Sequence, residues 1–379
     1  MKNRVPHGIL FFFISYSGDA MRKGNPYRLF FEILILLILS IIMIYSSSCV
    51  WAQYKYHNAF YYVQRQFFFS CIGLCSMFFI SKIPITFLRK YRNVWLIGCI
   101  VALLLVLIPG VGIERNGSRS WFGIGAFSIQ PSEFFKLAII IWSADYLSNK
   151  KRITQLKDFY KVIVVMGIGF GIILLQPDFG TALVMACSIV VILFVSNVPI
   201  KYFIYLAILG ATGLTALIIA APYRLARILS FLNPWSDPLG SGFQIIQSLY
   251  AIGPGSLFGV GFLNSIQKHF YLPEPQTDFI FSIVCEELGF IGGGIIIFLY
   301  GCIIYEGIKI ALCQKDAFNS FVVIGIIALF AIQVMINLGV VVGLFPVTGV
   351  TLPLFSYGGS SLIVVLSMFG IVFRISKNN

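Results

Sequence analysis

Charged residues are scarce in this chain. Asp, Glu, Lys and Arg make up 11% of its 379 residues, while 59% are hydrophobic and the mean hydropathy is +0.92. A soluble globular domain carries about 25% charged residues. The composition therefore excludes a water-soluble enzyme, a disordered chain and a nucleic-acid-binding module, and it indicates an integral membrane protein surrounded by membrane lipids.

Residues that bind metals or nucleotides are also few. The three histidines lie far apart, and the eight cysteines form no Cys-x-x-Cys pair; Cys71 and Cys75, one helical turn apart, are interpreted as packing residues. The sequence contains neither a Walker A loop nor a Gly-x-Gly-x-x-Gly motif after a strand. It thus gives no support for a zinc or haem site or for an ATP-driven pump. A divalent cation such as Mg²⁺ or Mn²⁺ could assist a catalytic reaction, but the sequence contains no coordination motif for one.

Ten hydrophobic runs approach the length of about 20 residues that a transmembrane helix needs. They cover residues 27–48, 60–80, 93–110, 131–147, 161–176, 179–197, 200–221, 277–305, 318–344 and 354–373. We therefore predict an all-α integral membrane protein with about ten transmembrane helices in a single polytopic domain, 27–379. Gly292, Gly293 and Gly294 are natural points for a bend in the long eighth run.

The basic residues predict the orientation. If the residues before the first run lie inside and the sides alternate, 17 of the 27 basic residues fall on the inner side. Because positive loops face the cytoplasm, we expect both termini to be cytoplasmic, and the net charge of +13 needs no nucleic-acid partner. Residues 1–26 form an N-terminal extension, which we interpret as a consequence of start-site choice; an interfacial or signal-like segment is the alternative.

The polar and ionisable residues that could act on a substrate are concentrated in the outer segments. The largest, 222–276, joins the seventh and eighth runs, and its many Pro and Gly residues argue against one long helix. Loops of this length in a compact fold are usually functional. Within it, residues 242–252 (GFQIIQSLYAI) are expected to form a short amphipathic helix at the membrane face.

Asp278 is the most notable acid on the outer side because it opens the eighth run. Ionisable residues in or near membrane spans are costly and are functional hypotheses by default. A carboxylate at a helix N-terminus is stabilised in its ionised form by the helix dipole. The alternative is a simple N-terminal cap, for which Thr277 is also a candidate. Glu286 and Glu287 lie deeper in the same run; Glu286 could share a polar cavity with Asp278, but structural pairing inside the bundle is favoured for both.

A second group of charges opens the fourth run at PSEFFK, residues 131–136. Glu133 and Lys136, three residues apart, share a helix face. They predict either a membrane-embedded salt bridge or a lysine that binds an anionic head group. Arg119 and Arg227 are candidates for phosphate binding because a planar guanidinium suits phosphate oxygens; a surface role is the alternative for each. Gln247, Lys268 and Glu274, in the large outer loop, complete the expected substrate-binding set.

Long motifs resemble the SEDS (shape, elongation, division and sporulation) family, nearest its FtsW/SpoVE branch. They read NPWSDPLGSGFQIIQSLYAIGPGSLFGVG, QKHFYLPEPQTDFIFSIVCEELGFIGG, NGSRSWFGIGAFSIQPSEFFKLA, QPDFGTA and LPLFSYGGSSL, with Arg65-Gln66 before them, and they run in family order from about residue 27. One departure is GPGSL at 253–257, where GSGGL is more usual, so Pro254 is expected to alter that loop. Residues 1–20 have no family counterpart.

The resemblance implies a peptidoglycan glycosyltransferase in the bacterial cytoplasmic membrane, which polymerises lipid II at the outer face with a class B penicillin-binding transpeptidase as partner. It also implies that the family's essential acid is Asp278, that its Glu–Lys pair is Glu133 and Lys136, and that its arginine before FLNP is Arg227. The reaction needs a base for the acceptor hydroxyl and positive charge for the departing pyrophosphate. Asp278 is the candidate base, and Lys136, Arg119 and Arg227 are candidates for the phosphates.

Two other functions remain as alternatives. A lipid II transporter (flippase) would use intramembrane charges such as Glu286, Glu287 and Lys136 to line its path, but it needs accessible polar groups on both sides, and here they gather on the outer one. A non-catalytic scaffold for a transpeptidase leaves Asp278 unexplained. The sequence does not distinguish division, elongation and sporulation, although the YLPEPQTDFIF motif leans to division or sporulation.

Overall fold

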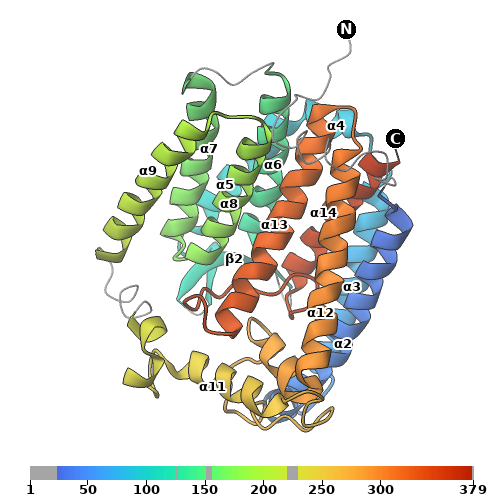
Figure 1. Ribbon diagram of the computed structural model, residues 1–379, viewed down its shortest axis with the longest axis vertical. Helices are drawn as coiled ribbons and strands as arrows, with labels where there is room; N and C mark the ends of the chain where they lie inside the picture. The colour runs from blue at the N-terminus through green and yellow to red at the C-terminus, as the bar shows by residue number, and fades with distance from the viewer. Residues whose placement is uncertain (1–23, 116, 125–126, 151–155, 220–228, 378–379) are drawn as a thin grey trace.

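The computed structural model describes residues 24–115, 117–124, 127–150, 156–219 and 229–377. Long helices form a bundle, with a small sheet and an irregular segment at one end (Figure 1). We call that end, which holds residues 112–115, 117–124, 127–129 and 234–279, the loop end. The opposite end, where α2 begins at Pro26 and α14 stops at Ser376, is the terminal end.

Each of the ten predicted runs corresponds to a helix of the bundle. These helices are α2 (Pro26–Tyr56), α3 (Tyr61–Ile80), α5 (Arg92–Val106), α6 (Pro131–Ser148), α7 (Leu156–Leu175), α8 (Phe179–Val195), α9 (Ile200–Ile219), α12 (Ile280–Leu312), α13 (Ala317–Val341) and α14 (Gly359–Ser376). Helices form here because the backbone groups of a membrane span must be paired within the segment.

Six of the described helices are long and apolar enough to cross a membrane: α2, α3, α7, α12, α13 and α14. The helices α5 and α8 are shorter apolar helices, as is the apolar stretch Ile200–Gly213 of α9. The remaining helix of the bundle, α6, carries Glu133, Lys136 and Asp145. The chain is thus a multi-pass membrane protein, and the prediction of an all-α membrane fold is confirmed.

Polar side chains fix the helix starts. Asn25 accepts hydrogen bonds from the backbone N–H groups of Tyr27 and Arg28 and so caps α2. Asp178 caps α8 and Asp316 caps α13 in the same way. Such caps satisfy N–H groups that have no partner inside the helix. At the terminal end, the short helix α4 (Ile85–Lys90) is joined to α6 by an ion pair of Arg89 with Asp145 (2.5 Å).

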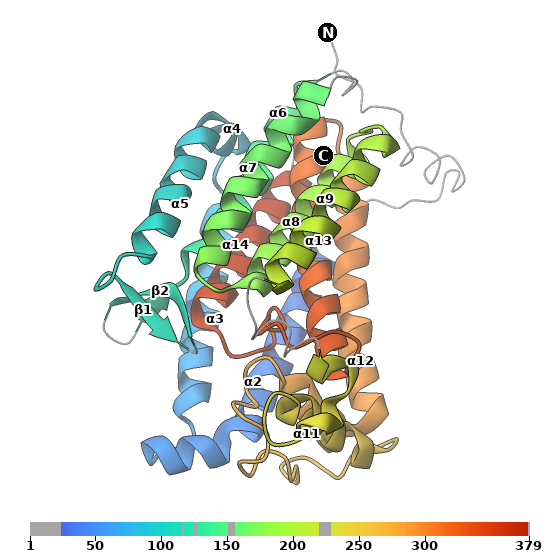
Figure 2. The same cartoon turned by 90° about the vertical axis from the view of Figure 1, so that its left-hand side faces the viewer.

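A small antiparallel sheet lies at the loop end, between the third and fourth of the predicted hydrophobic runs. It has the order β1 (Gly112–Arg115), β2 (Ser118–Ile124), β3 (Phe127–Ile129) and lies directly below α5 (Figure 2). The Ser120 hydroxyl donates to the carbonyl oxygen of Gln176 (3.3 Å), and the Gln176 side chain donates to the carbonyl oxygen of Leu103 (2.9 Å). The turn between α7 and α8 therefore ties the sheet to the end of α5.

Between α9 and α12, residues 229–232 are helical, and helix α11 (Phe243–Ile252) is preceded by a 3₁₀ turn (Pro234–Ser236) and followed by another (Gly253–Gly255). The predicted amphipathic helix at 242–252 is therefore present, and it lies across the loop end of the bundle (Figure 1). Its Ser248 hydroxyl contacts the Ser282 hydroxyl (2.7 Å) and donates to the carbonyl oxygen of Val341 (2.7 Å). These bonds dock α11 onto α12 and α13.

Helix α12 is broken at Gly289, not at Gly292–Gly294 as the sequence suggested. Gly289 has φ 65° and ψ −162°, which is not helical. The 3₁₀ turn and the residues after it fill the break: Val260 N–H donates to the carbonyl oxygen of Glu286 (2.9 Å), and Phe290 N–H donates to the carbonyl oxygen of Ser256 (2.9 Å). Backbone groups that lose their helical partners at the break are thereby paired again.

We expect Gly289→Ala to destabilise the protein strongly. An added Cβ would lie 2.4 Å from the backbone nitrogen of Gly259, and the backbone conformation is one that only glycine adopts readily. Such strain costs about 1–3 kcal/mol per residue before the clash is counted. Thermal unfolding in detergent measures the effect. Gly294→Ala is the matched control, since a Cβ there meets nothing within 4 Å; equal melting temperatures for the two variants would contradict this explanation.

Candidate functional site

Asp278 lies at the loop end, in the turn that leads into α12. The Thr277 hydroxyl donates to Asp278 Oδ1 (3.0 Å) and also to the carbonyl oxygen of Glu274 (2.7 Å). The Asn337 side chain of α13 donates to the carbonyl oxygen of Asp278 (2.7 Å). The turn is therefore held on both sides, while the Asp278 side chain is only partly buried.

Asp278 does not occupy the capping position of α12. Helix α12 begins at Ile280, three residues later than predicted, and its capping position is Phe279, with no side-chain capping hydrogen bond. Asp278 still lies within one turn of the helix N-terminus, where the dipole favours a carboxylate.

The segment 350–361, between α13 and α14, connects the Asp278 turn to the rest of the loop end. The Asn337 side chain donates to the carbonyl oxygen of Val350 (2.8 Å) as well as to Asp278. Tyr357 N–H donates to the carbonyl oxygen of Gln276 (2.9 Å). Asn337 was not predicted from the sequence, although a polar side chain inside an apolar run is the kind of signal that indicated Asp278.

Glu133 and Lys136 form a buried ion pair on the first turns of α6. Lys136 Nζ lies 2.8 Å from Glu133 Oε1, and the Ser361 hydroxyl of α14 donates to Glu133 Oε2 (3.3 Å). The predicted salt bridge is therefore present. Nearby, Gln130 donates to Asp178 Oδ2 (3.0 Å). Burial raises the pKa of Asp178, and the charge of Lys136 acts in the opposite direction.

Unpaired hydroxyl groups adjoin this ion pair. Within the described part of the chain, the buried hydroxyls of Ser132, next to Glu133, and Ser360, next to Ser361, have no hydrogen-bond partner. Buried polar groups normally have a partner in the protein, in ordered water or in a ligand. The residues that flank Glu133 and Ser361 in the sequence therefore have hydrogen-bonding capacity to spare.

The other predicted binding residues lie in varied surroundings. Arg119, in β2, makes a partly exposed ion pair with Glu114 (3.4 Å), which is weak enough to open for a ligand. Glu274 is exposed, with φ 44°, and Gln247 of α11 is partly buried. Arg227 lies outside the described residues. Substrate binding by these four residues stays a prediction.

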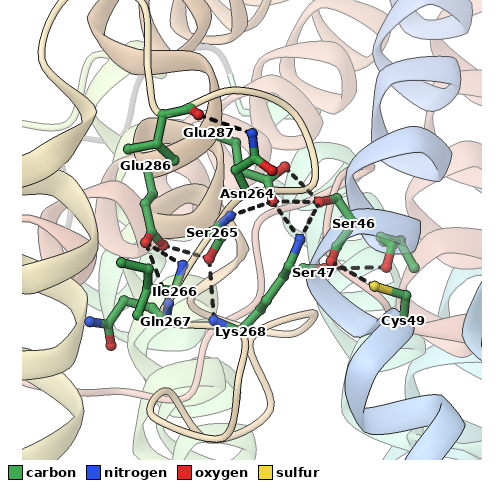
Figure 3. Close-up of polar contacts among 12 residues, drawn as sticks. Ser46, Ser47, Cys49, Asn264, Ser265, Ile266, Gln267, Lys268, Glu286 and Glu287 are labelled. Carbon is green, nitrogen blue, oxygen red and sulfur yellow. Dashed lines mark hydrogen bonds and ion pairs between the residues drawn. The ribbon is translucent and has the colours of Figure 1, made fainter.

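Lys268 is buried, with only 2% of its surface exposed, and its Nζ lies 3.0 Å from Glu287 Oε1. Figure 3 shows the cluster in which Lys268, Glu286 and Glu287 meet residues from the outer segment and α2. Structural pairing therefore describes both glutamates, and Glu286 bonds to Ser265 and Ile266. Substrate contact at Lys268 stays a prediction, but its surroundings are those of a structural pair.

A cavity of about 170 Å³ lies near α11, lined by Ser230, Gly240, Ser241, Gln244 and Val347. It includes none of the predicted site residues and is smaller than the roughly 300–1,000 Å³ of typical ligand pockets. We therefore place the candidate site at the Asp278 turn and the Glu133–Lys136 pair. Among the described residues, no three His, Cys, Asp or Glu side chains form a metal-binding group, and we assign no metal ligands.

Known proteins resemble the chain over nearly its whole length. It is 53% identical to "Stage V sporulation protein E" of Bacillus subtilis over 359 residues, which cover 94% of this chain and 98% of that protein. It is 40% identical to "Probable peptidoglycan glycosyltransferase FtsW" of Saccharophagus degradans, covering 95% of each chain.

Solved structures share the fold. A chain in "Structural coordination of polymerization and crosslinking by a peptidoglycan synthase complex" has a TM-score of 0.78 at 31% identity, covering 93% of this chain and 97% of that one. The rod shape determining protein RodA of Thermus thermophilus has a TM-score of 0.69 at 27% identity, covering 92% and 96%. The FtsW/RodA/SpoVE family model, described as "Cell cycle protein", matches residues 27–379. The chain therefore belongs to the FtsW/RodA/SpoVE family of membrane proteins.

Proposed function

We propose that this protein is a peptidoglycan glycosyltransferase that polymerises lipid II at the outer face of the cytoplasmic membrane, during cell division or sporulation. The observation that carries the proposal is Asp278, a partly exposed carboxylate in a turn at the loop end that hydrogen bonds from Thr277 and Asn337 hold in place. Membership of a family with relatives named as peptidoglycan glycosyltransferases supports it.

The chemistry suits these residues. The acceptor hydroxyl oxygen attacks the anomeric carbon of the donor sugar, and its proton passes to the Asp278 carboxylate. The bond from the anomeric carbon to the phosphate oxygen breaks, and the lipid pyrophosphate leaves with the electron pair. Because pyrophosphate is a good leaving group, the site needs positive charge more than a strong acid; Lys136 supplies it, with Arg119 and Arg227 as further candidates. One such displacement inverts the anomeric carbon and turns an α-linked donor into a β-linked glycan.

A partner transpeptidase fits the same proposal. One structural relative is part of a peptidoglycan synthase complex that coordinates polymerisation with crosslinking. A class B penicillin-binding protein would crosslink the glycan that this chain makes. The large outer segment exposes several apolar side chains, among them Trp235, Leu239 and Phe258, and exposed apolar patches of this kind serve as contact surfaces.

Incubation of purified lipid II with the purified protein in detergent, without a partner or an energy source, tests the proposed function. A glycosyltransferase forms glycan strands under these conditions. A transporter forms none, because it changes no covalent bond and detergent removes the two sides of the membrane. A scaffold forms none either, and absence of polymer from folded protein would count against the proposal.

We expect the loop end to face outward and both termini to be cytoplasmic, because most basic residues lie on the other side. In a cysteine-free background, Ser236→Cys should react with a membrane-impermeant maleimide in whole cells, since Ser236 is exposed at the loop end. Lys315→Cys, exposed between α12 and α13 at the terminal end, is the matched control and should react only after permeabilisation. The reverse pattern would show an inverted topology and exclude an outer active site.

A further inference from the structure

A buried polar cluster joins the outer segment to the first half of α12. We call it the clamp; its members are Ser46, Ser265, Lys268, Glu286 and Glu287 (Figure 3). Each of the five side chains is at most 2% exposed. Buried charges are stable only when they are paired and hydrogen-bonded, so the cluster requires close geometry from all its members.

Both carboxylates of the clamp accept hydrogen bonds. Glu287 Oε1 lies 3.0 Å from Lys268 Nζ and accepts from the Ser46 hydroxyl of α2 (2.6 Å). Glu286 accepts from the Ser265 hydroxyl (2.5 Å) and from the backbone N–H of Ile266 (2.7 Å). Three separate parts of the chain, α2, the outer segment and α12, therefore meet at one point.

The ion pair of Lys268 and Glu287 closes a segment of the chain that contains both Glu274 and Asp278. The two partners lie 19 residues apart in the sequence, and Asp278 falls near the middle of that interval. Within it, Phe270 has φ 68° and Glu274 has φ 44°, which are left-handed conformations that residues other than glycine rarely adopt. Such conformations persist only where the surrounding structure fixes them.

The break in α12 adds a second anchor at the same point. The half-helix 280–288 begins next to Asp278 and ends at the clamp. At that end its carbonyl groups at Glu286 and Glu287 accept from the backbone N–H groups of Val260 (2.9 Å) and Gly261 (3.1 Å). The position of Asp278 is thus set at one end by Asn337 and at the other by the clamp.

We propose that the clamp is a positioning device for Asp278, with Lys268 and Glu287 as positioning residues that do not touch the substrate. This inference rests on the proposed glycosyltransferase function. It gives Lys268 a role different from the substrate binding that the sequence suggested. A base must lie within hydrogen-bond reach of the hydroxyl proton that it accepts, and a misplacement of about 1 Å can lower a rate about 10²-fold.

The double variant Lys268→Met/Glu287→Gln tests the proposal. It removes both charges of the ion pair, so neither charge is left buried without its partner. We expect kcat for lipid II polymerisation to fall by about 10²-fold, while KM for lipid II stays unchanged. Lys268→Arg keeps the charge and should retain most of the activity. Should the double variant fail to fold, Ser265→Ala removes one hydroxyl, leaves both charges, and should lower kcat to a smaller extent at unchanged KM.

The matched control is Lys309→Met/Glu306→Gln, which removes a pair of the same residue types (3.5 Å) at the terminal end of α12. It should keep the wild-type kcat. A folded clamp variant with wild-type kcat would overturn the proposal, and a raised KM at unchanged kcat would assign Lys268 to substrate binding instead.

Hydrogen–deuterium exchange separates this proposal from the proposed function. Backbone exchange over residues 268–279 should rise in the clamp variant and stay unchanged in the control, whether or not the protein polymerises lipid II. Unchanged exchange in this segment would refute the clamp alone, whereas a wild-type protein that forms no glycan would refute the glycosyltransferase function alone.

Discussion

Asp278→Asn should abolish most of the glycosyltransferase activity and leave the protein folded. The amide keeps the size of the side chain and can still accept the hydrogen bond from Thr277, but it cannot take the proton of the acceptor hydroxyl. General-base catalysis contributes about 10²–10⁴-fold to a rate, so polymerisation of lipid II should fall by that factor. The measurement is the initial rate of glycan formation by purified variants in detergent.

Asp316→Asn is the matched control for this experiment. Asp316 caps α13 through a hydrogen bond to the backbone N–H of Phe318 (3.2 Å) at the terminal end, and asparagine is an equally good cap. Its activity and melting temperature should equal those of the wild type. Near wild-type polymerisation by folded Asp278→Asn protein would remove Asp278 from the mechanism.

Lys136 is expected to affect both stability and activity, and two variants separate these effects. Lys136→Ala leaves the buried Glu133 carboxylate without its ion-pair partner and should lower the free energy of unfolding by about 3–5 kcal/mol. The double variant Glu133→Gln/Lys136→Met removes both charges and should regain most of that stability. Its rate should nevertheless stay about 10²–10³-fold below wild type, because a group that stabilises the departing pyrophosphate is missing.

Thermal unfolding and polymerisation rates of these two variants decide between the two interpretations of the pair. If the double variant regains stability but not polymerisation activity, the result supports phosphate binding by Lys136. If the double variant regains wild-type activity, the ion pair is only structural. Lys309→Met/Glu306→Gln again serves as the control, because that pair lies at the terminal end of the bundle.

The bundle itself could be predicted from the sequence because a long apolar run in a membrane has few ways to pair its backbone. All ten runs correspond to helices for this reason. The sheet of β1, β2 and β3 could not be predicted, because its strands are short and β2 is held by the carbonyl of Gln176, 56 residues away from Ser120 in the sequence. Contacts over such distances leave no local pattern in a sequence.

The candidate site was predicted in part. Asp278 and the Glu133–Lys136 pair were found because each introduces charge at the start of an apolar run. The clamp was not predicted. The position of the break in α12 determines which residues of the outer segment contact Glu286 and Glu287, and the sequence does not give that position. Gly289 and Gly292–Gly294 look alike in sequence; the close approach of the Gly255–Gly259 backbone, visible only in the structure, selects Gly289.

The most direct measurement is the linkage and stoichiometry of the product that the wild-type protein forms from purified lipid II. Single displacement with Asp278 as the base should release one undecaprenyl pyrophosphate for each new glycosidic bond, and a muramidase that cleaves only β-linked strands should digest the glycan completely. A glycan that resists this enzyme, or folded protein that forms no glycosidic bond, would contradict the proposed inverting glycosyltransferase.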